Sequence, residues 1–262
     1  MKIAISGKGG VGKTSFSALL AISFSRAGYR VLAVDADPDA NLAATLGFPN
    51  AEKIVPMVEM KDLIEERMGT PSGGYGALFK LNPKVDDLPE KYSLVHNGIR
   101  LMVMGQIRKG GSGCFCPENA LVRRILGHLL MEEKDVLIVD MEAGIEHLTR
   151  GTSESVDVLI VVVEPGLRSI ETAHTVKALA ADLGIKTVLG VANKMRGEQD
   201  EAFIAEKMQG IRIIGTIPYS EDIVLGNMGD LGIDADRIAA GPVGQVMEAV
   251  IIEILKVGDA VS

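Results

Sequence analysis

A glycine-rich stretch near the start of the sequence carries the residues whose chemistry is clearest. It reads KGGVGKTS, from Lys8 to Ser15, and together with Gly7 it meets the pattern G-x-x-x-x-G-K-[ST]. Glycines let a backbone curl until its N–H groups point at phosphate oxygens, and the positive end of a following helix adds to the attraction. We expect Lys13 to bridge the outer phosphates of a nucleotide and the Thr14 hydroxyl to bind Mg²⁺. The alternative, a plain glycine-rich turn with an exposed lysine, fits the strand–loop–helix context poorly. The predicted nucleotide-binding residues of this loop are Gly9, Gly10, Val11, Gly12, Lys13, Thr14 and Ser15.

Acidic residues follow two apolar runs that we expect to be strands. Asp140 ends the run VLIVD (136–140), an arrangement typical of a carboxylate that holds Mg²⁺ through water. The stretch VDADPDANL places Asp35, Asp37 and Asp39 at the end of another run, where sheets of this kind bind ligands. Asp35 and Asp39 have the alternative role of capping the next helix.

The stretch that follows Asp140 has the form of a second nucleotide-sensing loop. Gly144 completes the pattern D-x-x-x-G, whose backbone is suited to contact a γ-phosphate. His147 comes soon after, but a lone histidine is more often solvated or hydrogen-bonded than a ligand, and we interpret it in that way.

Both cysteines of the chain, Cys114 and Cys116, stand in the stretch GGSGCFCPENA. Three roles compete for them. Free cysteine packs as a small apolar residue, but the surrounding glycines and polar residues indicate a surface loop that leads into a helix. A redox pair usually has the spacing C-x-x-C. Thiolates at a helix N-terminus are good ligands for zinc, nickel or copper(I), although two sulfurs make only half of a closed tetrahedral site.

Short apolar runs alternate with helical patterns along the chain. This alternation predicts a doubly wound α/β fold, with a mostly parallel sheet of seven to eight strands and helices on both faces. Asn97-Gly98 predicts a hairpin that adds an antiparallel edge strand over 92–95. We expect one domain over residues 1–262, with an insertion at about 50–90 that holds one or two helices and loose loops. The predicted strands are 2–6, 31–35, 99–105, 136–140, 156–163, 187–193 and 211–217, and the predicted helices are 13–27, 118–132, 169–183 and 199–209.

The net charge and the distribution of apolar residues limit which kinds of molecule the protein is expected to bind. The net charge of -8 argues against a general nucleic-acid binder and against a surface drawn to anionic lipid. The sequence shows neither an apolar segment of the signal-peptide kind nor a run long enough to span a bilayer. We therefore expect a cytoplasmic protein, where thiols stay reduced and a disulfide between Cys114 and Cys116 is disfavoured.

Four stretches together resemble the CooC-type nickel-insertion ATPases, accessory proteins for carbon monoxide dehydrogenase and related nickel enzymes. The stretches are KGGVGKTS, VDADPDANL, GCFCPENALVR and VDMEAGIEHLTRGT. The first alone is typical of the wider MinD/ParA-like superfamily of P-loop ATPases, in which a second loop lysine, here Lys8, reaches across a dimer interface to the partner's nucleotide. The cysteine stretch and the one after Asp140 narrow the resemblance to the CooC type.

The resemblance implies roles for further residues. Asp37, before the proline, would position the attacking water, and Pro218 falls where these families wrap the base. Asn193-Lys194 is similar to the base-contacting N-K of nucleotide-binding relatives, and Arg196 replaces the aspartate of guanine readers, which favours adenine. The implied cofactors are ATP or ADP and Mg²⁺.

The resemblance also suggests an answer for the cysteines. If two protomers face each other across their nucleotides, two C-x-C loops would meet on the two-fold axis and give a site of four sulfurs for Ni²⁺ or Zn²⁺. The implied protein is a nucleotide-dependent homodimer that serves carbon monoxide dehydrogenase or acetyl-CoA synthase, with no nucleic-acid or membrane partner. The competing interpretation is a MinD/ParA-like positioning or scaffold ATPase with a structural zinc at its dimer interface.

Overall fold

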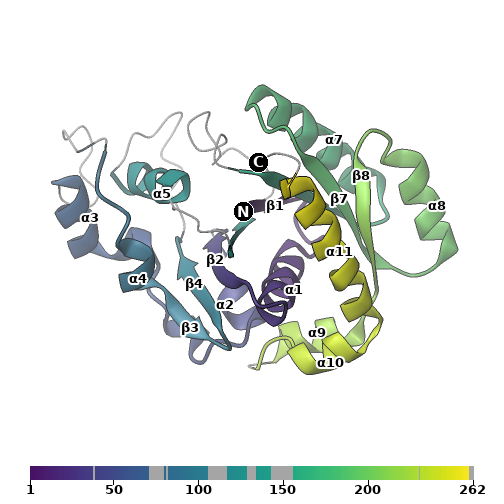
Figure 1. Ribbon diagram of the computed structural model, residues 1–262, viewed down its shortest axis with the longest axis horizontal. Coiled ribbons are helices and arrows are strands. Elements are labelled where there is room, and N and C mark those ends of the chain that lie inside the picture. The colour runs from purple at the N-terminus through teal and green to yellow at the C-terminus, as the bar shows by residue number, and fades with distance from the viewer. Residues whose placement is uncertain are drawn as a thin grey trace.

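The predicted strands join in one twisted sheet (Figure 1). This computed structural model of the protein describes residues 1–37, 39–70, 80, 82–105, 117–128, 134–142, 156–229 and 231–259. Over these residues the sheet has eight strands in the order β3-β4-β2-β5-β1-β6-β7-β8. The strands are β1 (Lys2–Ser6), β2 (Arg30–Ala36), β3 (Leu94–His96), β4 (Ile99–Val103), β5 (Asp135–Met141), β6 (Val158–Val163), β7 (Val188–Met195) and β8 (Arg212–Pro218).

All neighbouring strands are parallel except β3 and β4, which form an antiparallel hairpin. Asn97 and Gly98, at the turn, have φ of 48° and 78°, as a type I′ turn requires. The expected α/β class and its hairpin are therefore confirmed. The edge strand begins at Leu94 and not at residue 92 as predicted. The reason is that a short helix, Leu88–Tyr92, occupies the preceding residues.

The central parts of most strands are apolar on both sides because helices cover both faces of the sheet. All six residues of β6 are buried, as are four of the five in β1. Successive side chains of β1 point to opposite faces, so Ile3 and Ile5 join one hydrophobic cluster while Ala4 joins the other.

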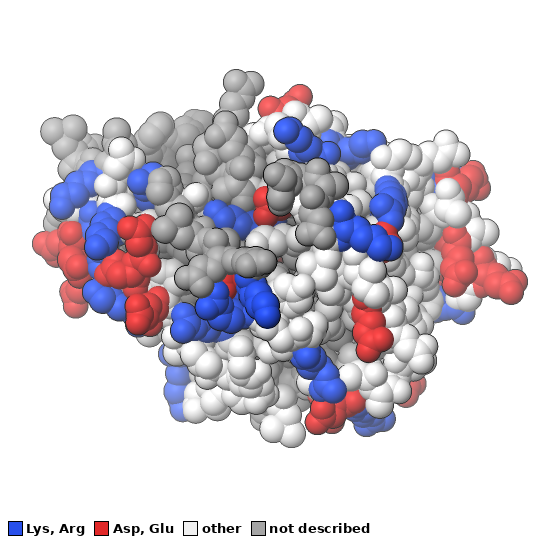
Figure 2. Space-filling model, viewed as in Figure 1, with Lys and Arg blue, Asp and Glu red and all other residues white. Residues whose placement is uncertain are grey.

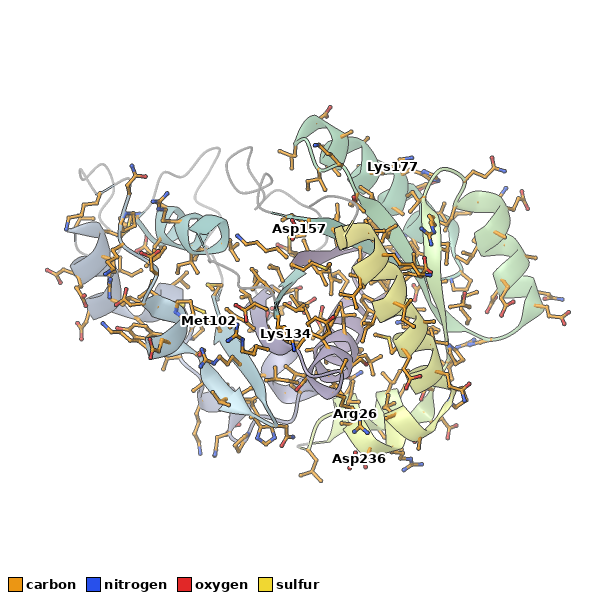
Figure 3. The ribbon with its side chains drawn as sticks, viewed as in Figure 1. Arg26, Met102, Lys134, Asp157, Lys177 and Asp236 are labelled. Carbon is orange, nitrogen blue, oxygen red and sulfur yellow. The ribbon has the colours of Figure 1, made fainter. Side chains whose placement is uncertain are left out.

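Five helices of the described segments cover the cluster around Ile3 and Ile5. Phe16 and Leu20 pack into it from the helix that follows β1, and Val250 and Ile254 pack from the last helix of the chain. The covering helices are α1 (Lys13–Arg26), α2 (Leu42–Thr45), α9 (Glu221–Met228), α10 (Ala235–Ala240) and α11 (Pro242–Asp259). Arg26 of α1 also pairs with Asp236 of α10 at 2.7 Å, so this layer is tied together at its exposed edge (Figure 3).

The opposite face carries α7 (Leu167–Asp182), α8 (Glu198–Lys207), α5 (Pro117–His128) and the insertion from Met57 onward. The insertion contains the 3₁₀ turns η1 (Ala51–Lys53) and η2 (Met57–Glu59) and the helices α3 (Lys61–Met68) and α4 (Leu88–Tyr92). Ile64 and Met68 of α3 share a hydrophobic cluster with the sheet residues Ala4 and Val34. From Met57 onward, the insertion is thus packed on this face of the sheet.

An ion pair holds the insertion together. The Arg67 guanidinium is 9% exposed and donates to both carboxylate oxygens of Asp87 at 3.0 and 2.8 Å, and to the Lys84 carbonyl at 3.2 Å. These bonds join the end of α3 to the start of α4. The Arg67 side-chain hydrogen bond holds the pKa of the Asp87 carboxyl well below its usual range.

Charge is unevenly spread over the surface. Figure 2 shows basic and acidic side chains interspersed near α3 and α4, and acidic side chains gathered at the other end of the molecule near α8. That helix carries Glu198, Asp200, Glu201 and Glu206. No helix in the described ranges combines the length and apolar character needed to cross a bilayer.

Candidate nucleotide-binding site

The glycine-rich loop joins β1 to α1 and fits only because of its glycines. A Cβ on Gly7 would lie 2.4 Å from the Val162 carbonyl oxygen at the end of β6. Gly12 has φ of 94°, and a Cβ there would lie 2.4 Å from Nδ2 of Asn193. Both positions are glycines that the sequence pattern requires. They are needed here because the loop packs closely against β6 and β7, as well as because glycine allows the loop's backbone conformation.

The loop leaves the first turn of α1 open for an anion. Gly12 is the residue before the helix, and among the described residues no side chain caps it. The amide groups of the first helical turn have no acceptor within the helix, and the helix dipole concentrates positive charge there. Lys13 is buried in the same turn, where it adds a full positive charge. The loop, the helix end and the lysine lie together, as the predicted phosphate site requires, and phosphate binding here stays a prediction.

Two buried carboxylates lie side by side at the ends of β2 and β5. Asp35 pairs with Asp140 in the register of these strands, and the side chains of both are fully buried. Burial raises the pKa of Asp140 to about 6, against the opposing effects of the Thr14 and Ser17 hydroxyls and the Lys13 ammonium. Burial likewise raises the pKa of Asp35 to about 7. Strands that are adjacent and parallel bring acids from distant parts of the sequence to one edge of the sheet.

The Asp140 carboxylate fits a role in binding Mg²⁺. Its Oδ1 accepts from the Ser17 hydroxyl at 2.9 Å, whereas its buried Oδ2 has no hydrogen-bond partner among the described residues. A buried carboxylate oxygen without a donor is costly unless a cation or a cation-bound water occupies the place. Oxygen ligands next to a phosphate site are what Mg²⁺ prefers, and Thr14 supplies a hydroxyl nearby. Bound Mg²⁺ would neutralise phosphate charge during hydrolysis.

Asp35 organises the loop that carries Asp37. Its Oδ2 accepts from the Leu42 amide at 2.9 Å, and its Oδ1 accepts from the Asp37 amide at 3.2 Å. Asp37 in turn accepts from the Asp39 amide at 3.0 Å. Leu42 is the first residue of α2, so the capping alternative holds for Asp35, while no bond from the Asp39 carboxylate to the helix is seen among the described residues. The sequence pattern did not reveal that Asp35 faces Asp140.

Asn193 and Lys194, at the end of β7, contact the phosphate loop. Asn193 Nδ2 donates to the Val11 carbonyl at 2.8 Å, and the Lys194 ammonium donates to the Gly10 carbonyl at 2.5 Å. Lys194 also has φ of 59°, a left-handed conformation that costs about 1–2 kcal/mol in a residue with a side chain. The expected base contact of these two residues stays a prediction, and their loop contacts were not foreseen.

The remaining nucleotide-site residues surround the same loop. Pro218 ends β8, and the amide of the next residue, Tyr219, donates to the Met195 carbonyl at 2.9 Å, which keeps the ends of β7 and β8 together. Ser15 accepts from Asn227 Nδ2 of α9 at 2.9 Å. Lys8 is half-buried and the neighbouring Gly9 is exposed, so the lysine lies at the loop's surface.

Several predicted residues lie outside the described residues. These are both cysteines, Cys114 and Cys116, together with Gly144 and His147. In the described part of the chain, no group of three or more histidine, cysteine or acidic residues is placed to hold a metal ion. The C-x-C metal site therefore stays a prediction.

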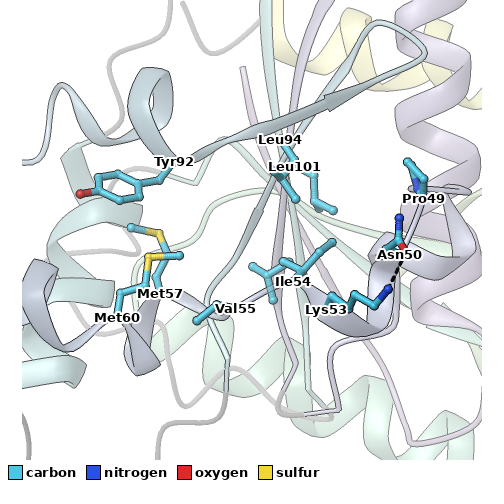
Figure 4. A pocket seen from close by; sticks show the side chains of 11 residues that line it. Pro49, Asn50, Lys53, Ile54, Val55, Met57, Met60, Tyr92, Leu94 and Leu101 are labelled. Carbon is cyan, nitrogen blue, oxygen red and sulfur yellow. Dashed lines mark hydrogen bonds between the residues drawn. The ribbon is translucent and has the colours of Figure 1, made fainter.

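An apolar cavity of about 310 Å³ lies at the sheet edge, apart from the nucleotide residues (Figure 4). Tyr92, Met57 and Met60 lie together at one end of its lining, and Leu94 and Leu101 lie next to each other farther along (Figure 4). Among the residues that the structure describes, none of the predicted site residues borders this cavity.

Comparison with known proteins agrees with this geometry. The CobQ/CobB/MinD/ParA nucleotide-binding domain matches residues 2–227. The chain belongs to this family. It is thus a P-loop ATPase, and the predicted fold and family resemblance are confirmed.

Two curated relatives are similar over most of the chain. The carbon monoxide dehydrogenase accessory protein CooC of Rhodospirillum rubrum is 49% identical over 226 residues, which are 85% of each chain. An uncharacterized ATP-binding protein of Methanocaldococcus jannaschii is 44% identical over 253 residues, 96% of this chain and 98% of the relative.

A solved structure shows the same fold at lower identity. The cell division ATPase MinD of Pyrococcus furiosus superposes with a TM-score of 0.69 at 21% identity, over 98% of each chain. At that identity the likeness shows the fold alone.

Proposed function

We propose that this family member is an accessory ATPase for the maturation of carbon monoxide dehydrogenase or a related nickel enzyme. The observation that carries the proposal is the 49% identity to the Rhodospirillum rubrum accessory protein over 85% of both chains. The nucleotide site supports it, because the phosphate loop, Lys13 and Asp140 supply the parts that ATP and Mg²⁺ need.

In the proposed cycle, ATP binding closes a homodimer and hydrolysis opens it. Lys8 of each protomer neutralises phosphate charge on its partner, so ATP favours the closed form. Asp37 orients the attacking water, and loss of the γ-phosphate releases the loops that contact it. A differential affinity of about 5.5 kcal/mol between the open and closed forms carries such an equilibrium from 1:99 to 99:1.

Closure would bring the cysteines of two protomers together. Cys114 and Cys116 from each chain would then supply four thiolates to Ni²⁺ or Zn²⁺, the cargo, and opening would release the metal to the client enzyme. We expect slow ATP hydrolysis by the protein alone, because switches of this kind wait for a partner to complete the site.

Replacing both cysteines by serine tests this proposal. The proposal predicts that C114S/C116S binds ATP like the parent, fails to retain metal and loses the ability to activate a nickel-free client enzyme. The matched control is S112A, which alters a residue of the same loop that has no thiol. Metal content and mass in solution are measured for all three proteins, with and without ATP.

The scaffold interpretation predicts a different result from the same proteins. Its support is the shared fold with MinD. A cysteine variant that only dimerises more weakly, yet still activates the client with nickel, would establish a structural zinc and overturn the delivery role.

A further inference from the structure

An ion pair behind the phosphate loop has no place in the chemistry described above. The Lys194 ammonium, which contacts the Gly10 carbonyl, also lies 3.0 Å from Oε2 of Glu164. Glu164 follows the last residue of β6, and its amide donates to the hydroxyl of Ser169 in α7 at 3.1 Å. A continuous set of polar contacts therefore runs from α7 through Glu164 and Lys194 to the loop.

The contacts from Asn193 and Lys194 orient two successive peptide groups. Lys194 holds the Gly10 carbonyl and Asn193 holds the Val11 carbonyl. In a planar trans peptide the carbonyl and the following N–H point in opposite directions. Drawing these carbonyls toward β7 thus turns the amides of Val11 and Gly12 away from β7. It also keeps carbonyl dipoles from pointing at bound anions.

The backbone of Lys194 is shaped for this contact. The register between β7 and β8 shifts between Ala192 and Met195, and Lys194 inside this irregularity adopts the left-handed conformation. Strained residues of this kind persist where the surrounding structure requires them, most often at functional sites. Here the bulge directs a long cationic side chain back over the loop.

We propose that Glu164 is a positioning residue for the phosphate loop, which acts by holding the Lys194 ammonium against the Gly10 carbonyl. Glu164 keeps the ammonium at the carbonyl and prevents it from moving to the nucleotide's own charges. The assignment concerns nucleotide binding alone and does not depend on the metal or the client enzyme.

The solvent exposure of the Lys194–Glu164 pair allows a role in positioning the loop to be distinguished from a role in overall stability. The side chain of Lys194 is 41% exposed and that of Glu164 is 30% exposed. Ion pairs this accessible contribute little to global stability. Loss of the pair is therefore expected to weaken nucleotide binding while the thermal unfolding midpoint stays near that of the parent.

The test is calorimetric titration of the full-length protein with Mg-ATP and with Mg-GTP. We expect E164Q to weaken binding of both nucleotides about two- to fivefold. We expect K194M to weaken both roughly tenfold, and the double variant to be no weaker than K194M, since Glu164 acts through Lys194. E164D, which keeps the charge, should recover part of the loss.

Two controls match these variants. Lys177 of α7, labelled in Figure 3, makes the same kind of contact, with its ammonium 2.5 Å from the Gly210 carbonyl, but away from the loop. Glu206 pairs with Lys207 at 2.6 Å on α8. K177M and E206Q should bind both nucleotides like the parent.

Three results would overturn the assignment. Parent-like binding of both nucleotides by E164Q would show that Glu164 does not position the loop. A change confined to the ratio of ATP to GTP affinity in K194M would assign Lys194 to the base. If K177M and E206Q lost as much nucleotide affinity as E164Q and K194M, the loss would reflect a general destabilisation of the protein. The parent titration is run first, so that failure to bind any nucleotide is seen separately as a failure of the site itself.

Discussion

Two clusters of charge in this protein are built in opposite ways. At the ends of β2 and β5, Asp35 and Asp140 are fully buried, face each other in register, and have pKa values raised by burial. In the insertion, Asp87 is satisfied by both arms of Arg67, and its pKa is held down.

The difference distinguishes a site that awaits a ligand from one that only holds the fold. The Lys13 ammonium opposes the rise in the pKa of Asp140 but does not offset the burial of the two adjacent carboxylates, so a cation that binds with the ligand would stabilise them. The Asp87 carboxylate is already neutralised by Arg67 and by the Lys91 ammonium at 2.7 Å, so it has no need of a further cation. We therefore expect substitutions at the strand ends to change activity most, and those in the insertion to change stability alone.

The largest effect is expected from D140N. Loss of the carboxylate that faces the Mg²⁺ position should reduce ATP hydrolysis on the order of 10²-fold or more, because the metal's charge stabilisation is worth several kcal/mol. Steady-state phosphate release at saturating Mg-ATP measures this. The control is D135N at the opposite end of the same strand, where the carboxylate accepts from Arg30 Nε at 2.7 Å. Hydrolysis by D140N at the parent's rate would contradict the assignment.

A smaller and pH-dependent effect is expected from D35N in the nucleotide-free protein. The Asp35 carboxyl titrates near pH 7 when folded and near 3.8 in its ordinary state, so the folded chain keeps a proton that the unfolded chain releases between these values. The parent's stability therefore falls as the pH rises through this window. D35N lacks this loss and should be more stable than the parent by about 1–3 kcal/mol above pH 7, with the difference vanishing near pH 4.

Urea unfolding across this pH range measures the Asp35 effect. The control is D157N, whose carboxylate accepts from the Lys2 amide at 2.7 Å at the start of β1, away from the strand ends that bind nucleotide. A D35N protein that is less stable than the parent at every pH would mean that the bonds to Leu42 and Asp37 outweigh the cost of burying the charge.

The smallest effect is expected from R67M in the insertion. Loss of the bonds to Asp87 and the Lys84 carbonyl should lower the thermal unfolding midpoint by about 2–4 °C and leave ATP hydrolysis unchanged. R212M, which breaks an exposed pair with Glu253, should lower it less. A clear loss of hydrolysis in R67M would show that the insertion is coupled to the nucleotide site and would break the comparison.

Local sequence determined the elements and the chemistry of the phosphate loop. Short, β-rich apolar runs predicted strands covered on both faces, and Asn97-Gly98 predicted a tight hairpin. The pattern around Lys13 predicted a strand, a loop and a helix in that order, and the structure has all three. The anion-binding role of the loop stays a prediction. These features depend on residues close in sequence, and so a single sequence contains them.

Tertiary structure alone decided which distant residues meet. Asp35 faces Asp140 because β2 and β5 are neighbours in the sheet, and Asn193 and Lys194 reach Val11 and Gly10 because β7 ends beside the loop. The ion pair of Arg67 with Asp87 could not be predicted from the sequence either, because the insertion contains many other acidic residues. Strand order and helix packing set these pairings through contacts across the whole chain, and no local spacing of residues encodes them.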